Sequence, residues 1–85
     1  MIKYKNIELP AYKDYKSVEK QLEHIKSELQ ECLTAYEKET PERFAEEVCD
    51  VLLSAVTLFT KAIPDKNKDE ALTYVIFKNK KRGYY

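Results

Sequence analysis

Two pairs of carboxylates stand out in this 85-residue sequence because of their spacing. Glu28 and Glu31 are three positions apart, and so are Glu47 and Asp50. Residues three apart on an α-helix project from the same side, so each pair presents two carboxylates together if its segment is helical. Four such groups crowded together repel one another or take up protons unless a cation lies among them. The spacing therefore predicts a metal site built from these four acids.

A helix-start signal, Thr40 followed by Pro41, lies between the two pairs. One helix is expected to end near Glu39 and the next to begin at once, so the chain folds back there. The inner acids each lie eight residues from Glu39, and the outer acids each lie eleven residues from it. In an antiparallel hairpin all four carboxylates then fall at matching heights, roughly 12 to 17 Å from the turn at about 1.5 Å per residue.

The segments that carry these acids have the apolar periodicity of helices. Apolar residues recur at steps of three and four from residue 15 or 17 to residue 39, and on a broader face from residue 41 to about 63, which predicts two amphipathic helices. The hairpin is expected to bury five large side chains: Leu29, Val48, Val51, Leu52 and Phe59.

A third helix is expected over about residues 68–81, after Pro64 ends the second. Asn67 offers it a cap, and Gly83 offers the stop. The first fourteen residues are expected to form an extended arm, with no convincing strand. The fold class is therefore predicted to be all-α, a helical hairpin plus a third helix in a single domain.

Composition limits the kinds of partner. Fifteen basic and fifteen acidic residues give no net charge, which argues against non-specific electrostatic binding of nucleic acid. The longest apolar-rich stretch is too short to span a bilayer, and no signal-like segment is seen near the start, so a cytoplasmic protein without a membrane partner is expected. Cys32 and Cys49 are expected to be free thiols. Because so short a chain builds only a small core, we expect a homodimer or homotetramer.

The donor atoms indicate which metal to expect. All four acids offer hard oxygen ligands, with neither the histidine at i+3 of carboxylate-bridged di-iron bundles nor the thiolates of many zinc sites. Mg²⁺ is the natural occupant, with Mn²⁺ as a substitute. Because Mg²⁺ in proteins is usually held by a few carboxylates together with water and substrate phosphates, a phosphorylated substrate is expected.

Two further groups of residues are candidates for holding that substrate. Polar and basic side chains gather at the end of the predicted third helix, and could meet phosphates or could merely complement the helix dipole: Lys78, Asn79, Lys81 and Arg82. His24 lies one helical turn before Glu28 and could face the same cleft, or could simply be packed or exposed.

These motifs, taken in order, resemble a known family. ELQE at residues 28–31, EEVCDVL at residues 46–52 and the basic segment KNKKRGYY resemble the two half-motifs and the C-terminal segment of the MazG-like all-α nucleoside triphosphate pyrophosphohydrolases. The resemblance covers most of residues 18–85. It implies an oligomeric, Mg²⁺-dependent enzyme that cleaves a nucleoside triphosphate between its α and β phosphates, with the four acids as its metal-binding and catalytic residues. The alternative is a non-catalytic helical oligomerisation module that binds nucleotide or metal.

Overall fold

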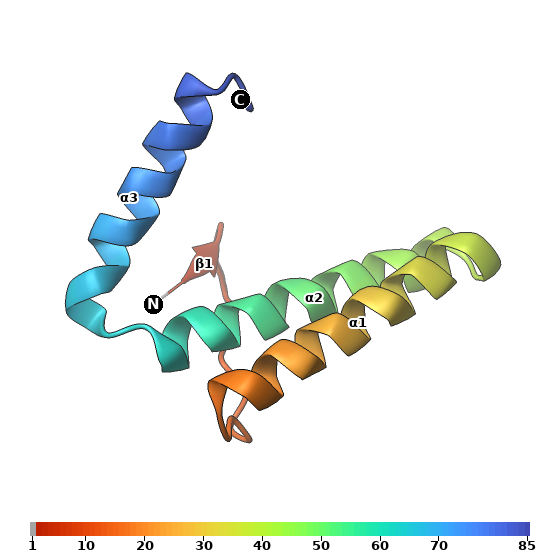
Figure 1. Ribbon diagram of the computed structural model, residues 1–85. Helices are drawn as coiled ribbons and strands as arrows, with labels where there is room; N and C mark the ends of the chain where they lie inside the picture. Colours follow the sequence, from red (N-terminus) through yellow and green to blue (C-terminus); the bar gives the residue numbers. More distant parts are fainter. Residues whose placement is uncertain (1) are drawn as a thin grey trace.

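The computed structural model describes residues 2–85 and consists of three α-helices preceded by a small β-hairpin (Figure 1). The elements, in chain order, are β1 (Lys3–Tyr4), β2 (Ile7–Glu8), α1 (Val18–Lys38), α2 (Pro41–Ala62) and α3 (Asp65–Lys81). The expectation of a mainly helical chain with three helices is confirmed. No helix in the part described is both long and apolar enough to cross a membrane.

The β-hairpin corrects the expectation that the N-terminal arm contains no strand. β1 and β2 pair antiparallel, with Lys3 opposite Glu8 and Tyr4 opposite Ile7. Lys5 lies between the strands at φ 54°, in the left-handed region that a tight turn requires. Each strand has only two residues, which is too short for the alternation by which strands are recognised in a sequence.

The turn between α1 and α2 forms as the sequence predicts. Thr40 caps α2 by accepting a hydrogen bond from the backbone N–H of Arg43 at 3.2 Å, and Pro41 occupies the first helical position. Ser17 caps α1 in the same way, accepting from the N–H of Lys20 at 3.1 Å. The two helices then pack side by side along the hairpin (Figure 1).

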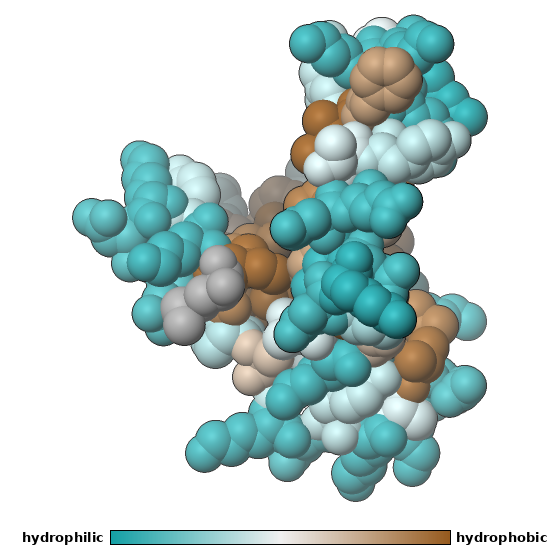
Figure 2. Space-filling model, turned by 90° about the vertical axis from the view of Figure 1, so that its left-hand side faces the viewer, coloured by the Kyte–Doolittle hydropathy of each residue, from teal (hydrophilic) through white to brown (hydrophobic). Residues whose placement is uncertain are grey.

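The predicted core of the hairpin is wrong, because small and polar residues fill the contact between α1 and α2. Leu29, Val48 and Leu52 are 53, 43 and 45% exposed, and Val51 and Phe59 are only half-buried. The buried residues are instead Gln21, Ala35, Glu47, Ser54, Val56 and Thr57. The apolar face of α2 is too broad for one neighbouring helix to cover, so much of it remains at the surface. Apolar side chains are accordingly open to solvent in Figure 2.

α3 begins three residues earlier than predicted. Pro64 precedes its first residue with φ −58°, and the N–H of Asn67 donates to the Pro64 carbonyl at 2.9 Å inside the first turn. Asn67 is therefore part of the helix and does not cap it, because proline has already fixed the backbone for helix entry.

The end of α3 is the one predicted. Gly83 has φ 77°, and its N–H donates to the Lys80 carbonyl at 3.1 Å. The N–H of Tyr84 reaches back to the Asn79 carbonyl at 3.0 Å, which completes a Schellman motif. α3 leaves the end of α2 and runs away from the hairpin (Figure 1), and none of its residues is buried.

Candidate metal centre

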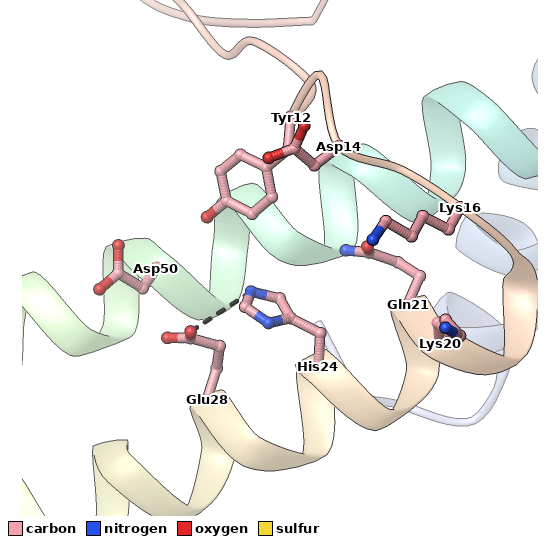
Figure 3. A pocket seen from close by; sticks show the side chains of 8 residues that line it. All are labelled: Tyr12, Asp14, Lys16, Lys20, Gln21, His24, Glu28 and Asp50. Carbon is pink, nitrogen blue, oxygen red and sulfur yellow. Dashed lines mark ion pairs between the residues drawn. The ribbon is translucent and has the colours of Figure 1, made fainter.

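Three of the four predicted acids meet between the helices. Glu28 on α1 and Glu47 and Asp50 on α2 each offer one carboxylate oxygen, and these oxygens lie within 4.8 Å of one another. Glu28 and Asp50 are both eleven residues from Glu39, so the turn there brings them to the same height, and Glu47 lies about one helical turn closer to it. Glu28 and Asp50 project toward each other from the two helices (Figure 3).

Two of these carboxylates are buried more deeply than their charge favours. The side chains of Glu28 and Glu47 are 13% and 8% exposed. Each has an Oε2 atom that is buried without a hydrogen-bond partner among residues 2–85. Leaving a buried carboxylate oxygen unpaired is costly, so native proteins rarely do so without an ion, a water or a function at that place. Both glutamates belong to the cluster, where a cation could satisfy the unpaired oxygens.

The electrostatics of Glu28 reflect this crowding. Burial raises the pKa of its carboxyl, and the nearby Glu31 carboxylate raises it further. His24 acts in the opposite direction, since its Nε2 lies 3.3 Å from Oε1 of Glu28. Asp50 and Glu47 add to the increase. A carboxylate that resists ionisation for these reasons is one that a bound cation would stabilise in its charged form.

Arg43 holds Glu47 in place, a role that the sequence analysis missed. Its Nη2 donates to Oε1 of Glu47 at 2.6 Å, while its Nη1 contacts Glu46 and its Nε lies 3.4 Å from Oε1 of Glu39. One oxygen of Glu47 is thereby paired, and Oε2 is the one without a hydrogen-bond partner among residues 2–85. The signal was present in the sequence, because Arg43 lies four residues from both Glu39 and Glu47 on a helical pattern.

Glu31 lies beside the cluster but does not join it. It lines a neighbouring hollow of about 320 Å³ together with Gln30, Thr34, Glu39, Arg43 and Glu47. Residues three apart on a helix are offset by about 60° around its axis. The rotation of α1 against α2 places Glu28 in the cluster, while Glu31 lines the hollow beside Glu47. The expected meeting of four carboxylates is thus reduced to three, with Glu31 next to them.

A larger pocket of about 390 Å³ opens from the cluster on its other side. Glu28 and Asp50 form one end of it (Figure 3). His24 also lines it, in agreement with the expectation that this residue could face the same cleft as Glu28. The remaining lining residues are Tyr12, Asp14, Lys16, Lys20 and Gln21. The proximity of these residues could not be predicted from the sequence, because it depends on where the arm crosses the hairpin.

Two long-range hydrogen bonds build this pocket. The backbone N–H of Tyr12 donates to Oγ1 of Thr57 on α2 at 2.9 Å, which ties the arm across the hairpin. The Gln21 amide donates to the Ser54 carbonyl at 2.9 Å and joins α1 to α2 at the pocket floor. The Tyr12 ring then meets the His24 ring edge to face, with 5.9 Å between centroids.

The predicted phosphate-binding cations are not brought to the cluster within one chain. Lys78, Lys81 and Arg82 line a separate hollow of about 280 Å³ on α3, together with Tyr74 and Phe77. The Asn79 amide lies 3.4 Å from the Tyr85 hydroxyl. Both cysteines are free thiols, as expected.

Comparison of the chain with models of protein families, with curated proteins and with solved structures found no match. What the chain does is therefore inferred from its carboxylate cluster and the pocket beside it.

Proposed function

We propose that this protein is a Mg²⁺-dependent nucleoside triphosphate pyrophosphohydrolase of the MazG-like type, which releases a nucleoside monophosphate and pyrophosphate. The observation that carries the proposal is the meeting of Glu28, Glu47 and Asp50 within 4.8 Å, with buried, unpaired oxygens on the first two. An acidic cluster on an exposed helix surface is common, but unpaired buried carboxylates are not.

The donor set fits Mg²⁺ or Mn²⁺. Glu28, Glu47 and Asp50 would hold the ion, and Glu31 lines the adjoining hollow together with Glu47. When bound, Mg²⁺ neutralises charge on phosphate oxygens, which is the main requirement for cleaving a phosphoanhydride. Arg43 would keep Glu47 in position through its contact with Oε1. The second carboxylate oxygen would remain available to the ion.

The neighbouring pocket offers the chemistry that a nucleotide needs. Its volume of about 390 Å³ lies within the range of small-ligand sites. Tyr12 supplies an aromatic ring, and His24 and Tyr12 together form a wall on which a base can stack. Lys16 and Lys20 supply positive charge at the pocket rim, so an anionic ligand would meet cations as well as the metal.

A second candidate function is a non-catalytic helical oligomerisation module that binds nucleotide or metal without turnover. The observation in its favour is the number of large apolar side chains left exposed on the hairpin and on α3. Such surfaces mark protein–protein contacts, and an assembly role requires no chemistry at the carboxylates.

The deciding experiment compares two neighbouring glutamates that share a partner. Glu47 and Glu46 both contact Arg43, but Glu47 is buried in the cluster and Glu46 is exposed. Pyrophosphate release is measured over a panel of common and modified nucleoside triphosphates, with Mg²⁺ and with Mn²⁺. We expect Glu47→Gln to lose at least about a hundredfold in kcat/KM, because it removes a charged metal ligand, while Glu46→Gln stays close to wild type.

Circular dichroism and sedimentation of the same proteins control for folding and assembly. Equal loss in both variants at unchanged helicity would contradict a specific role for Glu47. A wild-type protein that hydrolyses no nucleotide in the panel would favour the oligomerisation module.

A further inference from the structure

The last fifteen residues of the chain concentrate positive charge and aromatic rings. Residues 71–85 contain four of the fifteen basic residues and none of the fifteen acidic ones, so the remaining residues carry eleven cations against fifteen acids. The same segment contains four of the ten aromatic residues. The zero net charge of the whole chain therefore conceals one strongly positive end, to which the argument from net charge against nucleic-acid binding does not apply.

The corner between α2 and α3 directs this segment away from the hairpin. Nζ of Lys68 donates to the Ile63 carbonyl at 2.6 Å and to Oδ1 of Asp65 at 2.7 Å, which joins the first turn of α3 to the end of α2. α3 then runs away from the hairpin (Figure 1), and none of its residues is buried. At the top of Figure 2, the free end of α3 presents hydrophilic side chains gathered around apolar ones.

Aromatic and basic side chains share one face of α3. Tyr74, Phe77, Lys78 and Lys81 fall within about 100° of one another around the helix axis, and with Arg82 they line the hollow of about 280 Å³. We call these five residues the basic–aromatic face. Nζ of Lys78 lies 5.7 Å from the centre of the Tyr74 ring, and Nζ of Lys81 lies 5.4 Å from the centre of the Phe77 ring. Tyr74 and Phe77 are 62 and 59% exposed, so flat apolar surfaces alternate with positive charges in the open.

The aliphatic residues of α3 lie on its opposite face. Leu72, Val75 and Ile76 are exposed and are centred roughly 160° around the helix from the basic–aromatic face. A partner that covered these three residues would leave the basic–aromatic face open. The separation also argues against a bilayer as the partner, because an interfacial helix needs its apolar residues on one side, whereas here the aromatic and aliphatic residues are on different sides.

The fold does not use the cations of this face for other purposes. The carbonyls of residues 78–80 already accept hydrogen bonds from the backbone N–H groups of residues 82–84, so no basic side chain is required to pair the helix end. None of the ion pairs within residues 2–85 involves Lys78, Lys81 or Arg82. These three side chains are therefore available to an external anion.

From these observations we propose that the basic–aromatic face of α3 binds single-stranded nucleic acid. Lys78, Lys81 and Arg82 contact phosphates along the strand, while bases stack on Tyr74 and Phe77. The two lysines turn from the rings to the phosphates on their flexible stems, so the rings become free for the bases. A single strand fits this face better than a duplex, because its bases are not stacked on paired neighbours. The proposal does not depend on the proposed hydrolysis, since the hollow is separate from the pocket beside the carboxylates.

Fluorescence anisotropy of a labelled strand in EDTA tests the proposal with the whole chain. Single-stranded RNA and DNA are both expected to bind, and both more tightly than a DNA duplex of the same length, although the duplex has the higher charge density. The affinity should fall roughly twentyfold between about 50 and 200 mM salt, as expected for three phosphate contacts to a single strand. Duplex binding as tight as single-strand binding, or no binding at micromolar protein in low salt, would overturn the proposal.

Two variants separate the charges from the rings. Arg82→Ala should weaken binding about tenfold and reduce the slope of log affinity against log salt by about 0.7. Phe77→Leu should weaken binding about fivefold or more without changing that slope, because it removes a stacking surface but no charge. Lys66→Ala is the matched control, since Lys66 is an exposed cation in the first turn of the same helix and does not line the hollow. Equal weakening by Lys66→Ala and Arg82→Ala would overturn the assignment to this face.

Two further measurements identify a different ligand if there is one. Glu47→Gln should bind the strand as wild type does, and loss of binding in this variant would assign the cations to the carboxylate site instead. Co-sedimentation with phosphatidylserine vesicles tests a membrane. Vesicle binding that is tighter than strand binding and is lost in Leu72→Asp would overturn the proposal in favour of a membrane surface. Circular dichroism of every variant checks that α3 remains helical.

Discussion

Glu28 and Glu47 approach each other from α1 and α2, and each buries an Oε2 atom that lacks a hydrogen-bond partner within residues 2–85. Within residues 2–85, Arg43 contacts Glu47 and His24 contacts Glu28, in each case through the other oxygen of the carboxylate. Without a metal, these two buried carboxylates therefore contribute little to the stability of the hairpin. This cost to stability is typical of residues retained for binding or catalysis.

The first prediction is that Glu28→Gln stabilises the metal-free protein. Burial and neighbouring carboxylates raise the pKa of Glu28. The neutral amide removes both the cost of burying a charge and the repulsion from the other carboxylates, and it keeps the shape of the side chain. We expect a higher Tm in EDTA, by a few degrees, and a smaller rise in Tm on adding Mn²⁺ than wild type shows. Glu37→Gln, on the exposed side of α1, is the control and should change neither value. A lower Tm for Glu28→Gln in EDTA would show that its charge supports the fold.

The second prediction concerns pH. A carboxyl whose pKa is raised by folding contributes stability at low pH, where it is protonated, and loses that contribution as the pH rises through its folded-state pKa. The stability advantage of Glu28→Gln over wild type should therefore be small in acid and should grow toward neutral pH. Urea unfolding of both proteins in EDTA at several pH values measures this difference, and other carboxyls largely cancel from it. A difference that stays constant with pH would mean that Glu28 titrates normally.

Local signals in the sequence were enough to predict the helices and the turn. Thr40 and Pro41 start α2 where expected, and Gly83 terminates α3, because in each case the backbone requirement is met by the residue itself. Counting residues outward from Glu39 also predicted correctly that Glu28, Glu47 and Asp50 lie close together. It missed that Glu31 is directed elsewhere, which depends on the rotation of α1 against α2.

The hairpin interior could not be predicted from apolar periodicity. α2 is apolar over a wide arc, and periodicity does not show which part of that arc packs against α1 and which part stays exposed. Ala35 and Ser54 are fully buried, whereas Leu29 is half exposed. The direction of α3 was equally hidden, because it depends on Lys68 reaching back to the Ile63 carbonyl.

The third prediction tests the polar contact between α1 and α2. The Ser54 hydroxyl is buried without a hydrogen-bond partner among the described residues. Ser54→Ala removes this unpaired polar group and should be neutral or stabilising by up to about 1 kcal/mol. Gln21→Ala instead breaks the bond to the Ser54 carbonyl and opens a cavity, so it should destabilise by about 1 to 3 kcal/mol. Urea unfolding measures both. Destabilisation by Ser54→Ala would indicate that its hydroxyl binds an ordered water.

The last prediction concerns the hydrogen bond that ties the N-terminal arm to the hairpin. Oγ1 of Thr57 accepts the Tyr12 N–H at 2.9 Å and donates to the Leu53 carbonyl at 2.8 Å. Thr57→Val keeps the volume but removes the acceptor, so the Tyr12 amide should exchange its hydrogen roughly five- to tenfold faster, as expected for a loss of about 1 kcal/mol. Thr57→Ser keeps the hydroxyl and should protect the amide as wild type does. Because Tyr12 forms a wall of the pocket next to His24, the valine variant should also raise KM for the nucleotide while its Mn²⁺ affinity, measured without nucleotide, stays unchanged. A matching loss of Mn²⁺ affinity would show that the arm supports the carboxylates and not the substrate pocket.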